Sequence, residues 1–295
     1  MKRTKKIKPV RIPDAILTSD WHLREDTPVC RVDKNFEDAQ WEKVQHVARL
    51  QDKFKCPVLH AGDLFHHWKP SPRLLTLCIK YLPNDFCTVY GNHDLPQHNM
   101  ELNEKCGVTT LAAAERIIVL PHGHWNHLSE EPSIVMGRRK IAVWHVMTYA
   151  GKPPWPGCTA EPSNDLLRRY PGFDLIVTGD NHQTFVAKDG NRLLVNPGNL
   201  TRQTADDSPP VIFFYYADDN TVEEYELPYD EDAVSRVHLE RKEERDERIG
   251  AFIERLNTGW EGSLDFVANL RQFEQTNKIK RPVMEIVYKA VEEIK

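Results

Sequence analysis

Residues 85–94 read DFCTVYGNHD, an apolar run that ends in four residues with separate chemical uses. The run is typical of a buried β-strand, and Gly91 marks the turn that ends it. After the turn, Asn92 offers an amide oxygen, His93 an imidazole and Asp94 a carboxylate. The stretch therefore predicts a strand whose carboxyl end presents side chains capable of metal binding or proton transfer.

Four other apolar runs end in a similar way. The further predicted strands are DAILTSD (14–20), CPVLHAGD (56–63), KIAVWHV (140–146) and DLIVTGD (174–180). Loops at one end of the strands of a sheet can bring such residues together. Each short motif occurs often by chance, but five in one order indicate a shared site. Its predicted members are Asp20, His22, Asp63, Asn92, His145, Asp180 and His182.

The residue types in this set indicate the class of metal. Carboxylate, imidazole and amide ligands favour manganese, iron, zinc or magnesium over copper(I) or iron–sulfur clusters, which prefer thiolates. In a site that holds two metal ions, the cations repel each other, so a shared carboxylate must lie between them. The two ions of such a site are roughly 3.5–4 Å apart. They clamp the attacking and leaving oxygens of a phosphoester, and a metal-bound hydroxide attacks phosphorus in line.

The remaining patterns predict helices and hairpins around these strands. Helical spacing covers 35–54, and Ser71 and Pro72 begin a helix over 72–81. Ser163 is predicted to cap a short helix through Tyr170, and RIIVLP (116–121) is one more strand. Hairpins are predicted at 185–196, around a DG turn, and at 211–227. Two sheets covered by helices would accommodate this α/β pattern.

Composition excludes several classes of protein. The formal net charge of -5 over 295 residues excludes a strongly basic nucleic-acid wrapper, although a local groove can still bind phosphates. The six cysteines form no CxxC pair, and without a signal peptide they predict a reducing, cytoplasmic setting. Because no apolar stretch approaches 18 residues, we expect no membrane association.

We expect three segments along the chain. Residues 1–13 form a flexible basic arm, 14–228 the main domain and 229–295 a helical C-terminal extension. The extension begins with a charged helical stretch over 230–256 and continues with helices near 263–275 and 281–294. A charge run of this kind is either a solvated helix face or a docking site for a partner, and the sequence leaves both readings open.

The ordered motifs resemble those of calcineurin-like metallophosphoesterases, whose pattern is DxH, GD, GNH(D/E), His and GHxH. The resemblance covers about residues 14–200 and implies a four-layer α/β/β/α sandwich with a dinuclear site. It implies one metal held by Asp20, His22, Asp63 and His182. It implies a second metal held by Asp63, Asn92, His145 and Asp180, with Asp63 as the bridge. His93 would donate a proton to the leaving oxygen or stabilise charge there, and Asp94 would orient His93.

One position departs from the family pattern. The final GHxH reads Gly179-Asp180-Asn181-His182, so a carboxylate replaces an imidazole. The added negative charge hardens the site and favours manganese or magnesium over softer ions. We expect two divalent ions, with manganese favoured and iron, zinc or magnesium as alternatives.

A narrower resemblance points to DNA-repair exonucleases of the SbcD type. It is carried by GDLFHHWKPS (62–71), SDWHL (19–23), GNHDLP (91–96) and NPGN (196–199), although NPGN is equally consistent with a plain turn. It implies a DNA phosphodiester substrate and, by analogy, docking of an SMC-like ATPase on the C-terminal helices. A homodimer is left open.

Two other functions stay open at this point. A phosphomonoesterase or small-nucleotide phosphodiesterase would use the same metals, and nothing in the ligand set distinguishes it from a nuclease. A non-catalytic scaffold is less favoured, because every ligand position keeps a metal-capable side chain and His93 is present.

Several other histidines and tryptophans lie near these motifs in the sequence. The loop PHGHWNH (121–127) is interpreted as a surface loop, and His66 and His67 as exposed loop histidines. Trp21, Trp68 and Trp155 are candidates to stack on unpaired bases. Packing is the preferred role for Trp21, and Trp68 is the preferred stacking residue.

Overall fold

The computed structural model describes residues 11–237, 248–249, 266–277 and 279–292. The chain divides into two units, with the boundary between Ser235 and Arg236. The helices of the first unit are α1 (Phe36–Phe54), α2 (Pro72–Tyr81), α3 (Gly107–Ala113) and α4 (Ser163–Arg169), with 3-10 turns η1 (Pro96–His98), η2 (Met100–Lys105) and η3 (Glu231–Ala233). The second unit contains α6 (Phe266–Asn277) and α7 (Arg281–Glu292).

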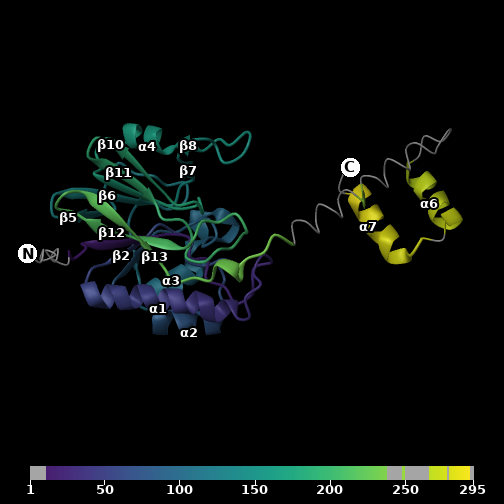
Figure 1. Ribbon diagram of the computed structural model, residues 1–295, viewed down its shortest axis with the longest axis horizontal. Coiled ribbons are helices and arrows are strands. Elements are labelled where there is room, and N and C mark those ends of the chain that lie inside the picture. The colour runs from purple at the N-terminus through teal and green to yellow at the C-terminus, as the bar shows by residue number, and fades with distance from the viewer. Residues whose placement is uncertain (1–10, 238–247, 250–265, 278, 293–295) are drawn as a thin grey trace, which may run out of the picture. The chain divides into compact units, whose positions relative to one another are not determined.

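Two sheets form the centre of the first unit (Figure 1). The six-stranded sheet has the order β13 (Thr221–Glu226), β12 (Val211–Tyr216), β1 (Ala15–Thr18), β2 (Val58–His60), β3 (Phe86–Thr88), β4 (Ile118–Val119). The five-stranded sheet has the order β10 (Phe185–Asp189), β11 (Arg192–Asn196), β9 (Leu175–Thr178), β6 (Arg139–Trp144), β5 (Ile134–Met136). A small pair, β7 (Thr148–Tyr149) with β8 (Glu161–Pro162), lies apart from both.

The alternation of side chains along the strands builds three apolar layers. Leu17 and Leu59 face the second sheet, where they pack with Val143 and Val177. The opposite faces of the same strands pack against α1, α2 and α3. On the outer face of the second sheet, Trp144 packs with residues of α4. The α/β fold with its α/β/β/α layers is therefore confirmed.

Strand direction decides where the predicted ligands gather. β1, β2 and β3 are mutually parallel, and so are β6 and β9. The loops that leave these five strands therefore emerge at the carboxyl ends of two packed sheets. Every predicted metal ligand lies in one of these loops. The two antiparallel hairpins were also predicted. β12–β13 extends the first sheet beside β1, and β10–β11 extends the second sheet beside β9.

Local capping agrees with the sequence at one helix and differs at another. Asn35 caps α1, and the Ser71 hydroxyl accepts a hydrogen bond from the backbone N–H of Leu74 at the start of α2. The predicted cap at Ser163 is wrong, because Pro162 occupies the N-cap of α4 and no side chain caps it. Ser163 is already the first helical residue, where its hydroxyl cannot take the capping position.

The second unit pairs its two helices through a small apolar cluster. Leu270 of α6 packs with Met284 and Val287 of α7, and the Tyr288 hydroxyl donates to Glu274. The two helices predicted near 263–275 and 281–294 are thus present. Most of the predicted charged helix at 230–256, and residues 1–10 of the predicted basic arm, lie outside the described residues.

In the part of the chain that the structure describes, no helix has both the length and the apolar character needed to cross a membrane.

The cap at Ser71 yields a stability prediction. Ser71→Ala removes the acceptor for the Leu74 N–H, so we expect the free energy of unfolding to fall by about 1 kcal/mol in urea titrations followed by circular dichroism. Ser163→Ala is the matched control and should cost clearly less, because that hydroxyl caps nothing. Equal losses for both variants would contradict the assignment of the cap.

Candidate metal centre

The loops after β1 and β2 run alongside each other beyond the ends of their strands. The backbone N–H of Asp20 donates to the carbonyl of Gly62 at 3.0 Å, and that of His22 donates to the carbonyl of Asp63 at 3.0 Å. These bonds continue the parallel ladder of β1 and β2 into the loops. They bring the side chains of Asp20, His22 and Asp63 to one place.

Four of the seven predicted ligands have an unusual backbone. Asp20, His22, Asp63 and Asp180 have φ angles of 50°, 44°, 57° and 76°. Residues other than glycine rarely adopt this left-handed backbone conformation. It persists where the surrounding structure imposes it, often at functional sites. Here the left-handed backbone conformation lets the four side chains point toward a common centre.

Glycines next to the ligands are required by close packing. A Cβ on Gly91 would lie 2.0 Å from Asp63 Oδ1, and one on Gly62 would lie 2.5 Å from His145 Nδ1. The Gly-Asp and Gly-Asn-His-Asp motifs therefore begin with glycine because no other residue leaves space for the neighbouring ligand.

His145 is fixed by two backbone groups. Its Nδ1–H donates to the carbonyl of Ala61 at 2.8 Å, and its own N–H donates to the carbonyl of Gly123. The Nε2 atom is left facing Asn92 Oδ1 at 2.8 Å. Gly123 belongs to the loop at 121–127, which also contacts His145 through Trp125. The loop thus supports His145 from behind, and its histidines are absent from the clusters of metal-capable side chains found in the described part of the chain.

One carboxylate oxygen lies midway between two histidines. Asp63 Oδ2 is 3.6 Å from His22 Nε2 and 3.6 Å from His145 Nε2. On one side, Asp20, His22 and His182 offer ligand atoms within 4.8 Å of one another, and His22 Nε2 lies 3.1 Å from His182 Nε2. On the other side, His145 Nε2 lies 3.8 Å from Asp180 Oδ1. Asp20, Asp63 and His145 form a second cluster of this kind, and Asn92 Oδ1 lies 2.8 Å from His145 Nε2. The structure therefore brings all seven predicted ligands together around Asp20 and Asp63.

The electrostatics of these groups fit bound cations. Asp20 and Asp63 are buried, and burial raises the pKa of both carboxyl groups. Burial lowers the pKa of His145, but the carboxylates of Asp63, Asp20 and Asp180 outweigh it and bring the pKa to about 9. Asp20 Oδ2 is buried without a hydrogen-bond partner. A cation at this point would stabilise the buried charge and the unpaired oxygen.

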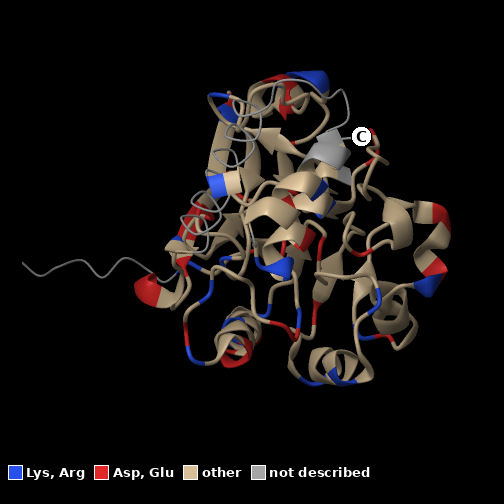
Figure 2. Cartoon of the chain, turned by 90° about the vertical axis from the view of Figure 1, so that its right-hand side faces the viewer, with Lys and Arg blue, Asp and Glu red and all other residues tan. Residues whose placement is uncertain are grey.

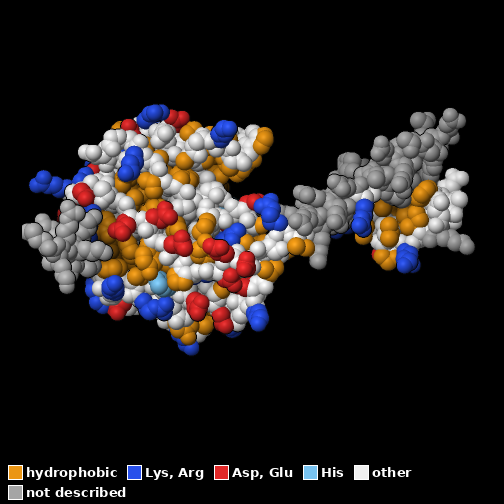
Figure 3. Space-filling model, in the orientation of Figure 1, with side chains coloured by type: hydrophobic (Ala, Val, Ile, Leu, Met, Phe, Trp, Pro, Cys, Tyr) orange, Lys and Arg blue, Asp and Glu red, His pale blue; other side chains and the backbone are white. Residues whose placement is uncertain are grey.

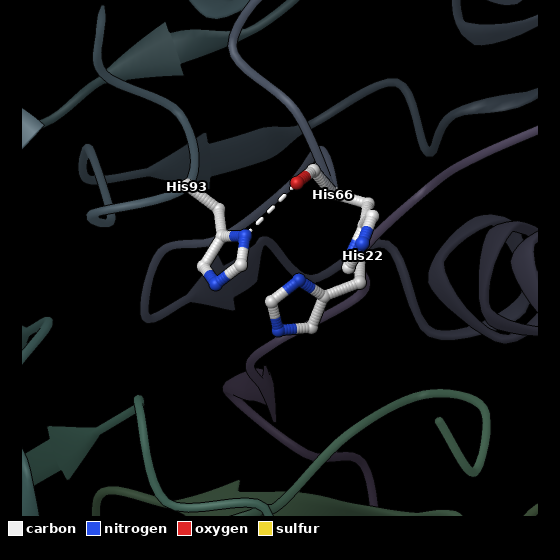
Figure 4. Close-up of side chains that lie close together, drawn as sticks. All are labelled: His22, His66 and His93. Carbon is white, nitrogen blue, oxygen red and sulfur yellow. Dashed lines mark hydrogen bonds between the residues drawn. The ribbon is translucent and has the colours of Figure 1, made fainter. Parts of the chain in front are cut away.

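His93 lies at the edge of the centre, where His22, His66 and His93 form a third cluster whose ligand atoms lie within 4.8 Å of one another. Its ring lies 4.8 Å from that of His22, and its Nδ1–H donates to the backbone carbonyl of His66 at 2.9 Å (Figure 4). Because a carbonyl only accepts, the Nδ1 atom carries the proton and Nε2 is the atom left for exchange. Burial lowers the pKa of His93.

The interpretation of His66 as an exposed loop residue is wrong. Its ring is half-buried, stacks on His93 with centroids 5.3 Å apart, and lies 5.6 Å from His22. The loop after β2 turns back over the site, because the N–H of His66 donates to the carbonyl of Leu23. His67, the next residue, is exposed as expected.

The expected hydrogen bond from Asp94 to His93 is not formed. The Asp94 carboxylate accepts instead from the backbone N–H groups of Leu64, Phe65 and Gly91. The residue therefore joins the loops after β2 and β3, and the orientation of His93 comes from the His66 carbonyl. Burial raises the pKa of Asp94 to about 6.

Sequence reasoning missed a carboxylate behind His182. Asp207 Oδ1 lies 3.4 Å from His182 Nδ1, and this partner raises the pKa of His182 to about 9 against the effect of burial. Asp207 also accepts from the Asn199 amide. Asn199 ends the NPGN stretch, so this stretch is more than a plain turn. Its Asn196 amide donates to the carbonyls of Asn181 and Gln183 and fixes the loop that carries His182.

Comparison with known proteins identifies the family of the chain. A family model described as the calcineurin-like phosphoesterase superfamily domain matches residues 14–219. A search of the curated proteins found no match. Similar solved structures include a novel archaeal phosphodiesterase, with 15% identity over 72% of this chain and 99% of that chain and a TM-score of 0.42. Others are vacuolar protein sorting 29 from Cryptosporidium parvum (17% identity, 74% and 100% covered, TM-score 0.36) and a metallophosphoesterase from Sphaerobacter thermophilus (15%, 73% and 89%, 0.38).

Asp207 leads to a prediction about metal affinity. Asp207→Asn keeps the shape of the side chain but removes the charge that holds His182 Nδ1–H. We expect manganese affinity, measured by calorimetry on protein stripped with chelator, to fall about 10- to 100-fold. Asp206→Asn removes a charge from the exposed neighbouring residue and should leave the affinity unchanged. Unaltered manganese binding by Asp207→Asn would remove this residue from the site.

Proposed function

The chain belongs to the calcineurin-like phosphoesterase superfamily, and from this premise we propose that it is a two-metal phosphodiesterase that cleaves DNA as an SbcD-like nuclease. The observation that carries the hydrolytic part is Asp63 Oδ2, 3.6 Å from an imidazole nitrogen on each side. A single carboxylate oxygen in this position suits a ligand shared between two cations.

We propose the two ligand sets that the family resemblance implies. One ion would be held by Asp20, His22, Asp63 and His182 and the other by Asp63, Asn92, His145 and Asp180, and the short distances within each set support this division. Three carboxylates in the set favour a hard ion, manganese first. When bound, the two ions supply a water nucleophile at neutral pH and neutralise the charge of the phosphate.

The protein's own groups provide orientation and a proton. His93 directs its Nε2 toward the site because the His66 carbonyl occupies the Nδ1–H. In the proposed reaction, protonated His93 Nε2 gives its proton to the leaving oxygen. His66 acts as a positioning residue through this backbone carbonyl and through its stacking on the His93 ring.

The DNA substrate is supported by residues that the narrower resemblance already singled out. The stretch GDLFHHWKPS contributes both Asp63 and His66 to one centre. Lysine and arginine residues alternate with acidic residues along the ribbon in Figure 2, and the net charge is -5. We therefore assign phosphate binding to the metal centre and not to an extended basic surface. The same centre would also serve a small-nucleotide phosphodiesterase or a phosphomonoesterase, which remain the alternatives.

The second unit supports the proposed SMC-like ATPase partner only by its surface. Met284 and Val287 of α7 pack toward α6, whereas Val283 and Ile286 of the same helix are exposed. An exposed apolar pair on an amphipathic helix suits docking against another helix.

The proposed activity is tested with a panel of substrates. The full chain is stripped with chelator, reloaded with manganese, and assayed on bis-p-nitrophenyl phosphate, p-nitrophenyl phosphate and single- and double-stranded oligonucleotides. We expect cleavage of the diester and of DNA that disappears on metal removal and returns with manganese. Turnover of the monoester alone would refute the nuclease proposal, and no turnover by fully loaded protein would refute the hydrolase.

His93 provides a prediction that separates catalysis from metal binding. His93→Ala removes the Nε2 proton donor but none of the seven ligands, so we expect full metal content and a turnover rate on bis-p-nitrophenyl phosphate lower by about 100- to 10,000-fold. Metal content is measured by plasma mass spectrometry. His67→Ala, at an exposed histidine nearby, should retain the wild-type rate. An undiminished rate in His93→Ala would exclude the proposed role.

A further inference from the structure

A cavity of about 580 Å³ opens beside the metal centre. Asp180 and His182 line one side, and the loop of residues 150–160, between β7 and β8, lines the other. The apolar part of the wall is made by Met147, Pro154 and Trp155. In Figure 3 this loop projects from the first unit with hydrophobic side chains at its tip and a hollow beneath it. A substituent on a phosphorus atom at the metals would extend into this space.

The wall of the cavity is tied to the loop that carries the ligands. β7 and β8 close the base of the 150–160 loop, and the Thr148 hydroxyl donates across them to the carbonyl of Glu161 at 2.7 Å. The Asn181 amide, between two proposed ligands, donates to the carbonyl of Thr148 at 2.7 Å. The position of the loop is therefore coupled directly to the metal centre.

Trp155 is the unusual residue of this wall. Its side chain is 52% exposed, although tryptophan is normally largely buried. Three prolines of the stretch KPPWP restrict the backbone around it, and the N–H of Cys158 donates to its carbonyl. Trp68, the residue that the sequence favours for stacking, is half-buried against the core and lies beside His67. Trp21 is fully buried, as expected.

We propose that this cavity is a nucleoside subsite, in which a base stacks on the Trp155 indole while its phosphodiester lies at the metal centre. The proposal rests on the proposed function. It narrows the substrates to phosphodiesters in which the nucleoside stays attached to phosphorus when the leaving group departs. The volume suits a ligand of this size, since small-molecule pockets span roughly 300–1,000 Å³. Stacking on an aromatic side chain accepts every base, because each base has a π-face.

Two amides that line the subsite are held by the protein and are not aimed at a base. The amide of Gln183 donates to the carbonyl of Asp206 and accepts from Ser208, and the amide of Asn181 is bound to Thr148 and to the Gln183 N–H. These side chains line the cavity but their hydrogen-bonding groups are engaged within the protein. Adenosine and thymidine esters should therefore be cleaved with kcat/KM values within about threefold of each other.

The test uses two esters with the same leaving group. Thymidine 5′-(p-nitrophenyl phosphate) and methyl p-nitrophenyl phosphate release the same p-nitrophenolate, so the ratio of their kcat/KM values measures what the nucleoside adds. In the manganese-loaded full chain, we expect Trp155→Ala to lower this ratio about 5- to 100-fold and Trp155→Phe to keep most of it. Tyr81→Ala removes a partly exposed aromatic ring from α2 and should leave the ratio unchanged.

A binding measurement separates this proposal from the proposed activity. Calorimetry with thymidine 5′-monophosphate and manganese should show binding to the wild type that is at least about fivefold weaker in Trp155→Ala. If the wild type cleaves neither ester but this difference is found, the hydrolase proposal fails and the subsite stands. A ratio unchanged by Trp155→Ala, or unaltered nucleotide binding, overturns the subsite.

Discussion

The structure depends on placing several carboxylates, buried and close together, where two sheets meet. Asp20, Asp63 and Asp94 are each almost fully buried, and such groups are costly unless backbone donors or cations surround them. Asp94 is satisfied by three backbone N–H groups and needs no ion. Asp63 accepts a single backbone N–H, from His93, and Asp20 Oδ2 has no hydrogen-bond partner. The buried carboxylates therefore have different roles. Asp94 joins two loops, whereas Asp20 and Asp63 favour the binding of cations.

The surrounding backbone is arranged to meet that demand. Left-handed conformations at four ligands and the glycine at position 91 let the loops approach more closely than ordinary strand ends would allow. Backbone carbonyls then fix the imidazoles, Ala61 for His145 and His66 for His93. Because left-handed backbone and buried carboxylates are costly, bound metal should contribute to the stability of the fold as well as to chemistry.

Much of this was predictable, and what was not has a physical cause. Strand ends and their order are local patterns, so the convergence of the seven proposed ligands and the layered α/β fold followed from the sequence. Side chains that act across long separations gave no such pattern. Asp207 supports His182 from a loop with no motif of its own, and His66 looked exposed because the loop's return over the site is set by a backbone bond to Leu23. Asp94 was assigned the wrong partner, since adjacency in GNHD does not show which way a carboxylate turns. The exposure of Trp155 likewise depends on tertiary structure.

The loop at 150–160 leaves and re-enters the fold through the two short strands β7 and β8. Its length and composition can therefore vary while Thr148 and Asn181 keep the base in place. During evolution this loop could be replaced, so that the protein accepts different phosphoester substrates while the metal centre stays the same. The metal-binding residues and the residues that select the substrate could then change independently, because the 150–160 loop joins the rest of the fold at β7 and β8.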